Sequence, residues 1–447
     1  MKCFLAAVFS SLLFTTSFIF GQNVTLLGSL NPYPASSYTD IWGYEANGRE
    51  YAFLGVTGGT SIIDVTNPSN PEEIVFIQGP LAPPYEWRDL KTHSNYLYII
   101  SEGSGAGSGL QIVDLSQLPD TAFLVNTYNQ TFASAHNIYI ADGFAYIVGT
   151  SSGGIHILDL SNTISPVQTA YYSASGYVHD VYVWNDTAYA SSENTYDLIN
   201  LTNKSNPQLI SQSAALPGIY AHSGWLTEDK RYFIACEEFN TRDITVWDLQ
   251  DRTTWDLVVQ NWQMTGTSPV HNVFVLGDYA HISYYKDGYV ILDISDPTNP
   301  QFAGQYDTYP SSGGGTYNGA WGVYPYLPSG NVIVSDMATG LYIFKFTPPT
   351  TITENDGLTP ADFSLSQNYP NPFNPSTKIE FRITEFGFVN LKVYDVLGNE
   401  VAILLNEIKS AGTYEVSFDA SNLPSGIYFA RLTAENQSSI IKMSLLK

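Results

Sequence analysis

A strand-like pattern returns seven times along the first three quarters of the chain, and this repeat restricts the fold more than any other feature. Successive copies begin between 43 and 50 residues apart. The openings are TDIWGY (39–44), RDLKTH (88–93), HNIYIA (136–141), HDVYVW (179–184), HSGWLT (222–227), HNVFVL (271–276) and WGVYPY (321–326). A second series, from SIIDVT (61–66) to YIFKFT (342–347), falls between them. A period of this length, with room for about four short strands per unit, is typical of β-propeller blades.

The two series predict an all-β fold with a seven-bladed β-propeller over residues 23–347. After YIFKFT the chain runs directly into PPTTITENDGLTPAD (348–362), which leaves no fourth strand for the last unit. The segment VTLLGSL (24–30), in contrast, is a strand without a unit of its own. We expect it to form the outer strand of the seventh blade, because this joins the two ends of the ring and covers an unpaired edge.

The first 22 residues have the features of a secretory signal peptide. Lys2 precedes an apolar run of about 18 residues, and small and polar residues follow, so cleavage is expected near Gly21 or Gln22. An uncleaved anchor is the less favoured alternative, because no basic flank follows. Cys3 would leave with the signal and Cys236 would stand alone, without an internal disulfide. No second segment is long and apolar enough to span a bilayer in the mature protein.

Charge restricts the choice of partners. The formal net charge is −24 at pH 7, which argues against nucleic acid and anionic membrane surfaces. Cations and neutral glycans remain compatible with it. The last 85 residues differ, since 363–447 carry seven Lys and Arg against eight Asp and Glu. Their alternating segments, separated by Gly, Asn and Pro turns, predict a small C-terminal β-sandwich after a linker at 348–362.

Two parts of the chain resemble known protein families. The second series of strands, nearest in LQIVDLS (110–116) and YVILDIS (289–295), resembles the LVIVD-repeat proteins, bacterial extracytoplasmic propellers. Within that family the region looks like the choice-of-anchor type, which implies exposure at the cell surface or release but no defined activity. The motifs YPNPFNP, VYDVLGNEV and LPSGIYFARL, with a basic terminal Lys447, are similar to the C-terminal sorting domain of the bacterial type IX secretion system. This resemblance implies the type IX machinery as a partner and an extracellular or outer-surface location.

Four of the seven histidines stand at the start of a repeat unit. Because the first strand of each propeller blade lines the central channel, the unit openings should surround one channel mouth. They place there Thr39, Arg88, His136, His179, His222, His271 and Trp321. The next positions are Asp40, Asp89, Asn137, Asp180, Ser223, Asn272 and Gly322. The ends of the second strands add Glu102, Glu193, Glu237 and Asp336 to the same face.

Two interpretations of these histidines remain open. His136, His179, His222 and His271, with carboxylates nearby, are suited to a divalent metal ion. A histidine that recurs from blade to blade also suits a structural hydrogen bond at each blade junction. Arg88 and Trp321 replace histidine in two blades, and this asymmetry favours a ligand site made of these six residues.

The sequence is therefore compatible with two functions. The first is a non-enzymatic secreted or surface propeller that binds a glycan or a protein at its mouth. The alternative is a metal-dependent hydrolase centred on the four histidines. The sequence contains no nucleophile elbow, phosphate loop or zinc-protease helix. The recurring Asp64, Asp114, Asp159, Asp248 and Asp293 are interpreted as turn caps.

Overall fold

The computed structural model describes residues 23–80, 87–239, 242–266, 268–310, 317–349, 363–384, 387–409, 412–434 and 437–447. The expected signal peptide at 1–22 and most of the expected linker lie outside these ranges. No helix in the described ranges has the length and apolar character needed to cross a membrane.

Seven four-stranded antiparallel sheets make up the described part of residues 23–349, and they are numbered here as blades one to seven. Blade one holds β2 (Tyr38–Ala46), β3 (Arg49–Val56), β4 (Gly59–Asp64) and β5 (Glu72–Gln78); blade two holds β6 (Arg88–His93), β7 (Tyr96–Ser101), β8 (Leu110–Asp114) and β9 (Phe123–Tyr128). Blade three holds β10 (Asn137–Ala141), β11 (Phe144–Val148), β12 (Ile155–Asp159) and β13 (Val167–Tyr172); blade four holds β14 (Asp180–Trp184), β15 (Thr187–Ser192), β16 (Thr195–Asn200) and β17 (Gln208–Gln212).

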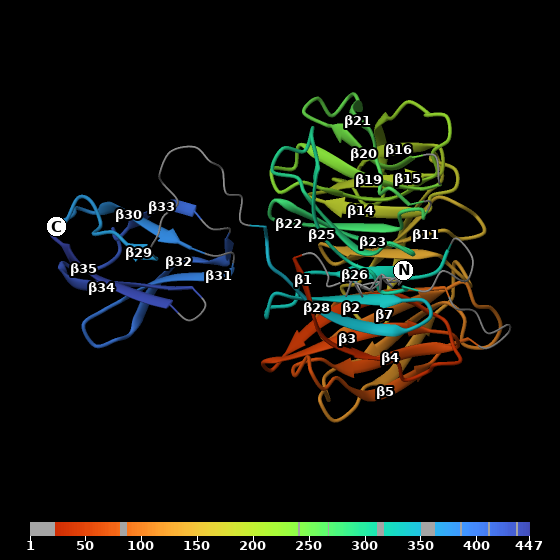
Figure 1. The fold of residues 1–447 in the computed structure, drawn as a ribbon, viewed down its shortest axis with the longest axis horizontal. Coiled ribbons are helices and arrows are strands. Elements are labelled where there is room, and N and C mark those ends of the chain that lie inside the picture. The colour runs from red at the N-terminus through yellow and green to blue at the C-terminus, as the bar shows by residue number, and fades with distance from the viewer. Residues whose placement is uncertain are drawn as a thin grey trace, which may run out of the picture.

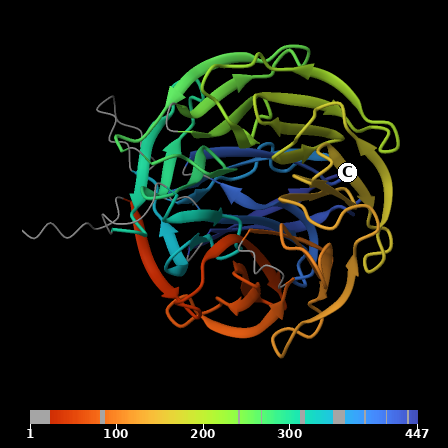
Figure 2. The ribbon, with the colours of Figure 1, turned by 90° about the vertical axis from the view of Figure 1, so that its right-hand side faces the viewer.

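The remaining three blades complete the ring, whose colours run around it from red to cyan in Figure 2. Blade five holds β18 (Ala221–Leu226), β19 (Tyr232–Phe239), β20 (Arg242–Asp248) and β21 (Asp256–Trp262); blade six holds β22 (Asn272–Leu276), β23 (Tyr279–Tyr284), β24 (Gly288–Asp293) and β25 (Gln301–Tyr306). Blade seven holds β26 (Ala320–Tyr324), β27 (Asn331–Asp336), β28 (Gly340–Phe346) and β1 (Val24–Leu30).

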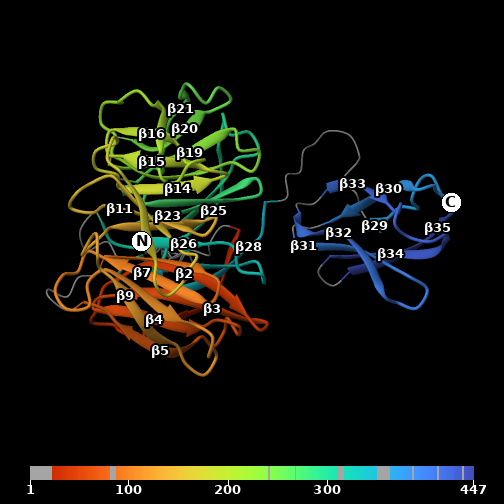
Figure 3. The ribbon, with the colours of Figure 1, turned by 180° about the vertical axis from the view of Figure 1, so that it is seen from behind.

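The first strand of the chain closes the ring, as the sequence predicted. β1 pairs antiparallel with β28, from Val24 opposite Phe346 to Leu30 opposite Leu341. Figures 1 and 3 show these two ends of the propeller side by side. A register shift between Leu26 and Gly28 interrupts the pairing. A Cβ atom at Gly28 would lie 1.9 Å from the carbonyl oxygen of Pro68, so only glycine fits where this strand passes the loop of blade one.

The apolar core lies between the blades. The seven junctions between neighbouring blades each have one cluster of buried apolar side chains in the described residues. Leu54 and Ile63 of blade one, for example, pack with Ile333 and Ile343 of blade seven, so apolar burial also joins the first blade to the last. Every blade therefore relies on its two neighbours for a core, as expected for a chain of repeats.

The recurring aspartates cap turns at the ends of the third strands. Asp159 accepts a hydrogen bond from the backbone N–H of Ser161 at 2.7 Å, and Asp293 accepts one from Ser295 at 2.9 Å. The same contact to the residue two positions on is made by Asp64, Asp114, Asp248 and, with its amide oxygen, Asn200. The predicted capping role is thereby confirmed.

The C-terminal region forms two sheets with a core between them. The first sheet contains β29 (Ser364–Leu365), β30 (Ser376–Ile383) and β33 (Gly412–Asp419); the second contains β32 (Glu400–Lys409), β31 (Gly387–Tyr394), β34 (Gly426–Ala434) and β35 (Gln437–Leu445). Phe381 from the first sheet and Leu391 and Leu432 from the second belong to one buried cluster. Phe373, inside the proline-rich run, is 1 % exposed and packs into the same cluster. The predicted β-sandwich is confirmed.

Candidate functional site at the channel mouth

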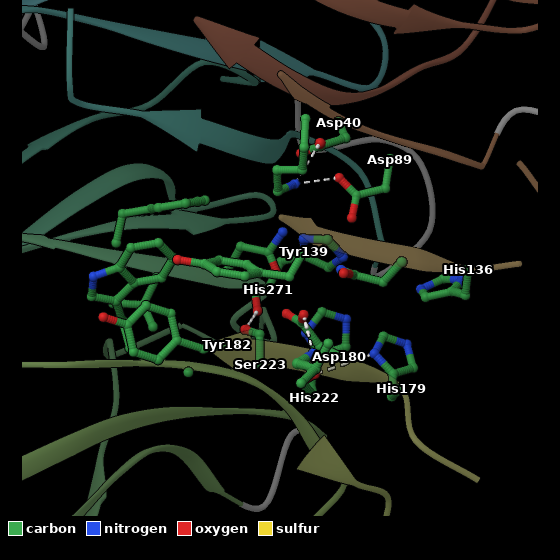
Figure 4. A pocket seen from close by; sticks show the side chains of 18 of the residues that line it. Asp40, Asp89, His136, Tyr139, His179, Asp180, Tyr182, His222, Ser223 and His271 are labelled. Atoms are coloured by element: carbon green, nitrogen blue, oxygen red, sulfur yellow. Dashed lines mark hydrogen bonds and ion pairs between the residues drawn. The ribbon is translucent and has the colours of Figure 1, made fainter. Parts of the chain in front are cut away.

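Five aromatic rings from consecutive blades form a continuous row of tilted ring contacts at one mouth of the channel, and Figure 4 labels the four histidines among them. His136, His179 and His271 immediately precede β10, β14 and β22, while His222 lies in β18 and Trp321 in β26. From His136 to Trp321, the distances between the centroids of successive rings are 4.2, 4.2, 4.4 and 4.2 Å. These five residues are called the ring arc below. Equivalent strand positions in adjacent blades bring the side chains together, which explains the repeat in the sequence.

Two members of the ring arc join neighbouring blades through Nδ1. His179 Nδ1 lies 3.2 Å from the carbonyl oxygen of His222, and His271 Nδ1 lies 2.6 Å from that of Trp321. A carbonyl oxygen only accepts hydrogen bonds, so Nδ1 carries the proton in both rings and Nε2 keeps a lone pair. Burial lowers the pKa of His179 and of His271 well below the ordinary value, and both rings are neutral near pH 7. These contacts support the structural interpretation and leave Nε2 available.

His136 differs from its neighbours because it is paired with a carboxylate. Its Nδ1 lies 2.7 Å from Oε1 of Glu102, which comes from the end of the second strand of blade two. Burial acts to lower the pKa of His136, but the hydrogen bond and the charge of Glu102 outweigh it and raise the pKa above its ordinary value. The ring arc therefore begins with an imidazole that favours the protonated form.

His222 is buried between two neighbouring imidazoles whose planes are tilted against its own, and it faces a second carboxylate. Its Nε2 lies 3.7 Å from Oε2 of Glu238, and its Nδ1 has no hydrogen-bond partner among the described residues. The hydroxyl of Tyr285 donates to Oε1 of Glu238 over 2.6 Å. Burial lowers the pKa of His222. The ligand atoms of His179, His222 and Glu238 all lie within 4.8 Å of one another.

A buried ion-pair network lies beside the ring arc (Figure 4). Lys91 Nζ lies 2.5 Å from Oδ1 of Asp89 and 3.7 Å from Oδ2 of Asp40, and it sits 4.5 Å from the centre of the Trp42 ring. The second oxygen of Asp89 accepts the backbone N–H of Ile138 in the next blade at 2.9 Å. Burial, and then the charge of Asp89, raise the pKa of Asp180 to about 7. Asp40 and Asp89 therefore connect neighbouring blades through backbone N–H groups, and Lys91 pairs with both.

The structure separates Arg88 and Asp336 from the histidines, although the sequence places all of them at the channel mouth. Arg88 is fully buried, and its Nε donates to the carbonyl oxygen of Val56 in blade one over 3.1 Å. It does not line the mouth pocket, whereas the four histidines and Trp321 do. Asp336 is also buried, where its carboxylate accepts the backbone N–H groups of Ala338 and Thr339.

Sequence reasoning selected Glu237 at the end of β19, but Glu238 is the carboxylate that faces His222. Glu237 is fully buried and accepts hydrogen bonds from Tyr196 and Thr245. The register of β18 and β19 shifts between Ala221 and Ser223, so His222 is an extra, bulged residue. Two adjacent glutamates point to opposite faces of a strand, and the sequence carries no signal that locates the bulge.

Comparison with known families identifies two parts of the chain. The LVIVD repeat matches residues 47–77, 133–173 and 269–308. The secretion system C-terminal sorting domain matches residues 367–445. The chain thus contains LVIVD repeats and a C-terminal sorting domain, and this domain indicates sorting for export by the type IX secretion system. No curated protein matches the sequence.

Several solved structures are distantly similar. PorZ, a surface component of the type IX secretion system of Porphyromonas gingivalis, has 13% sequence identity and a TM-score of 0.48; the alignment covers 92% of this chain and 60% of PorZ. A protein from Lactobacillus plantarum has 9% identity and a TM-score of 0.49, with 86% of this chain and 100% of that chain covered. The computationally designed Ika8 protein has 9% identity and a TM-score of 0.48, with coverages of 73% and 100%.

Proposed function

We propose that this protein is an exported propeller that binds an extracellular saccharide at the mouth of its channel. One observation carries the proposal: an exposed aromatic ring contacts a tyrosine whose hydroxyl holds a carboxylate in place. Tyr317 is 46 % exposed and contacts Tyr285 edge-on at 5.2 Å, and Tyr285 holds Glu238 by a hydrogen bond. Aromatic rings stack on the C–H faces of sugars, while carboxylates accept hydrogen bonds from their hydroxyl groups. A few polar groups converging in a concave pocket are typical of small-ligand sites.

Charge narrows the class of saccharide. Glu102 and Glu238 both contact histidines of the ring arc. Burial, followed by charges that include Glu193, raises the pKa of the nearby Tyr177 and Tyr220 hydroxyls. A mouth with three carboxylates in a chain of net charge −24 repels uronic acids and sulfated sugars. The proposed ligand is a neutral or amino sugar.

The proposal assigns each region a part in export. Residues 1–22 act as the signal peptide for the inner membrane, and 363–447 act as the type IX sorting signal after the linker at 348–362. The propeller at 23–347 then functions outside the bacterial cell, either released or at its surface. The family match at 367–445 supports the role of the last region.

A metal-dependent hydrolase is the second candidate. It is favoured by the grouping of His179, His222 and Glu238, since two imidazoles and a carboxylate with an open position are a known catalytic metal set. Turnover would require a bound ion and a substrate positioned beside it. Hydrolysis of a bound oligosaccharide that stops when a chelator is added would favour this candidate over simple binding.

Binding of oligosaccharides to the purified full chain tests the main proposal. An array of neutral, amino and acidic oligosaccharides should show binding to the first two classes only. Tyr317→Ala should weaken binding by about tenfold or more. Phe123→Ala is the matched control, because Phe123 is similarly exposed, at 41 %, but lies on β9, the outer strand of blade two. Absence of any sugar binding, or equal loss in both variants, would contradict the proposal.

A further inference from the structure

His222 and Glu238 face each other with no hydrogen bond between them. The 3.7 Å between Nε2 and Oε2 is too long for a hydrogen bond. If Nδ1 carries the proton, Nε2 directs its lone pair at a carboxylate oxygen; if Nε2 carries it, Nδ1 is left as a buried lone pair without a partner among the described residues. Either state leaves a buried polar atom uncompensated, which is unfavourable. A cation between the two side chains removes this cost.

The separation fits a small metal ion. Bonds of about 2.1 Å from a tetrahedral ion to a ring nitrogen and a carboxylate oxygen hold those two atoms about 3.4 Å apart. The observed 3.7 Å is close to that value. His179 supplies a third atom, since all three ligand atoms lie within 4.8 Å of one another. We propose that His179, His222 and Glu238 bind a divalent transition-metal ion at the channel mouth.

Neighbouring groups hold two of these ligands in the form that a metal needs. His179 Nδ1–H donates to the carbonyl oxygen of His222, which leaves the lone pair on Nε2. The hydroxyl of Tyr285 donates to Oε1 of Glu238, which leaves Oε2 for the ion. Hydrogen bonds of this kind from the atom that does not bind the metal are the usual outer contacts of metal-binding histidines and carboxylates.

The ligand types limit the kind of metal. Two imidazole nitrogens and one carboxylate oxygen suit Zn²⁺, Co²⁺, Ni²⁺ or Fe²⁺, whereas Ca²⁺ and Mg²⁺ prefer oxygen ligands alone. The carboxylates of Asp40 and Asp89 lie in the same pocket but already have Lys91 as their counterion. Three protein ligands leave one tetrahedral position for water or a ligand atom. The inference concerns the same mouth as the proposed function but does not depend on a saccharide.

Metal titration of the tag-free full chain tests the inference. The chain is stripped with a chelator, dialysed, and titrated with Zn²⁺ by calorimetry and with Co²⁺ by visible absorption, with no sugar present. We expect one ion per chain and the intense absorption bands of low-coordinate Co²⁺. Glu238→Gln should reduce affinity by at least about tenfold. Glu102→Gln is the matched control, because Glu102 pairs with His136 at the same mouth but lies outside the three-residue group.

Each result of the metal titration either supports or overturns the inference. Failure of the parent chain to bind either ion, or a Co²⁺ spectrum identical to that of the free ion, overturns the inference whether or not the variants fold. Binding that is equally strong in Glu238→Gln and in His179→Gln also overturns it. Loss of affinity in those two variants, with the Glu102→Gln chain unchanged, supports it. Because no sugar is present, failure of saccharide binding leaves this result untouched.

Discussion

Nδ1 of His271 lies 2.6 Å from the carbonyl oxygen of Trp321 in the next blade, and the centroids of the two rings lie 4.2 Å apart with the ring planes tilted by 43°. The hydroxyl of Ser283 donates to the same carbonyl oxygen over 2.8 Å. This contact joins blades six and seven at the channel. The structural and binding interpretations of the histidines are therefore compatible, because the blade junction uses Nδ1 and a ligand would use Nε2.

Replacing His271 with alanine should destabilise the propeller. The change removes a buried hydrogen bond and a ring that packs on both neighbours, and we expect a loss of about 2 kcal/mol in the free energy of unfolding. Urea denaturation followed by tryptophan fluorescence measures it. His93→Ala serves as the control, since His93 is half-buried at the end of β6 and should change stability by less than about 0.5 kcal/mol. Equal effects of the two substitutions would argue against a junction role.

Lys91 is expected to matter through the charges it neutralises. Burial, and then the charge of Asp89, raise the pKa of Asp40 well above its ordinary value, so Asp89 carries the negative charge of the pair. Lys91→Met leaves the buried carboxylate of Asp89 without a counterion, so we expect a loss of about 3–5 kcal/mol. The double variant Lys91→Met, Asp89→Asn should recover a large part of that loss, because the charge without a counterion is removed as well. Unfolding free energies of the parent, both single variants and the double variant form a cycle. Additive effects in this cycle would show that the ion pair is not coupled as described.

The repeat made most of the fold predictable from sequence. The sequence contains seven unit openings, seven unit closings and one strand without a unit of its own, and this count predicted a closed ring. The pairing of β1 with β28 closes the ring as predicted. The C-terminal β-sandwich was predictable because its strands have an alternating residue pattern and are separated by Gly, Asn and Pro turns. Such features depend on local pattern and on the count of strands, and a single sequence carries both.

Details of the site were less predictable, because they depend on side-chain direction. Arg88 occupies the same unit position as the histidines, yet it extends to Val56 of the preceding blade and is buried there. The choice between Glu237 and Glu238 depends on a bulge at His222. A one-residue shift in a strand moves each side chain to the opposite face of the sheet. No residue type in this stretch indicates where that shift occurs.

The pKa of Asp180 gives a pH dependence with a definite sign. Its folded value of about 7 lies above the unfolded value of about 3.9, so the native state binds the proton more tightly. The contribution of this carboxyl to stability is fully present below about pH 4 and is lost as pH rises through about 7. We expect Asp180→Asn to be more stable than the parent at pH 8, on the order of 3 kcal/mol, and similar to it at pH 4. Thermal unfolding at both pH values measures the difference, and a constant offset between them would contradict the assignment.

The C-terminal sandwich should be needed for export but not for the fold of the propeller. Its core, which includes Phe381, Leu391 and Leu432, is built from residues 365–445 alone, whereas the seven blade-junction clusters draw on residues 24–346. In a bacterium with a type IX secretion system, a chain that lacks 363–447 should remain inside the outer membrane with an unchanged thermal transition of the propeller. Cell fractionation and immunoblotting measure its location, and Tyr317→Ala in the full chain should be exported like the parent. Equal export of the shortened chain would show that the matched sorting domain does not direct this protein.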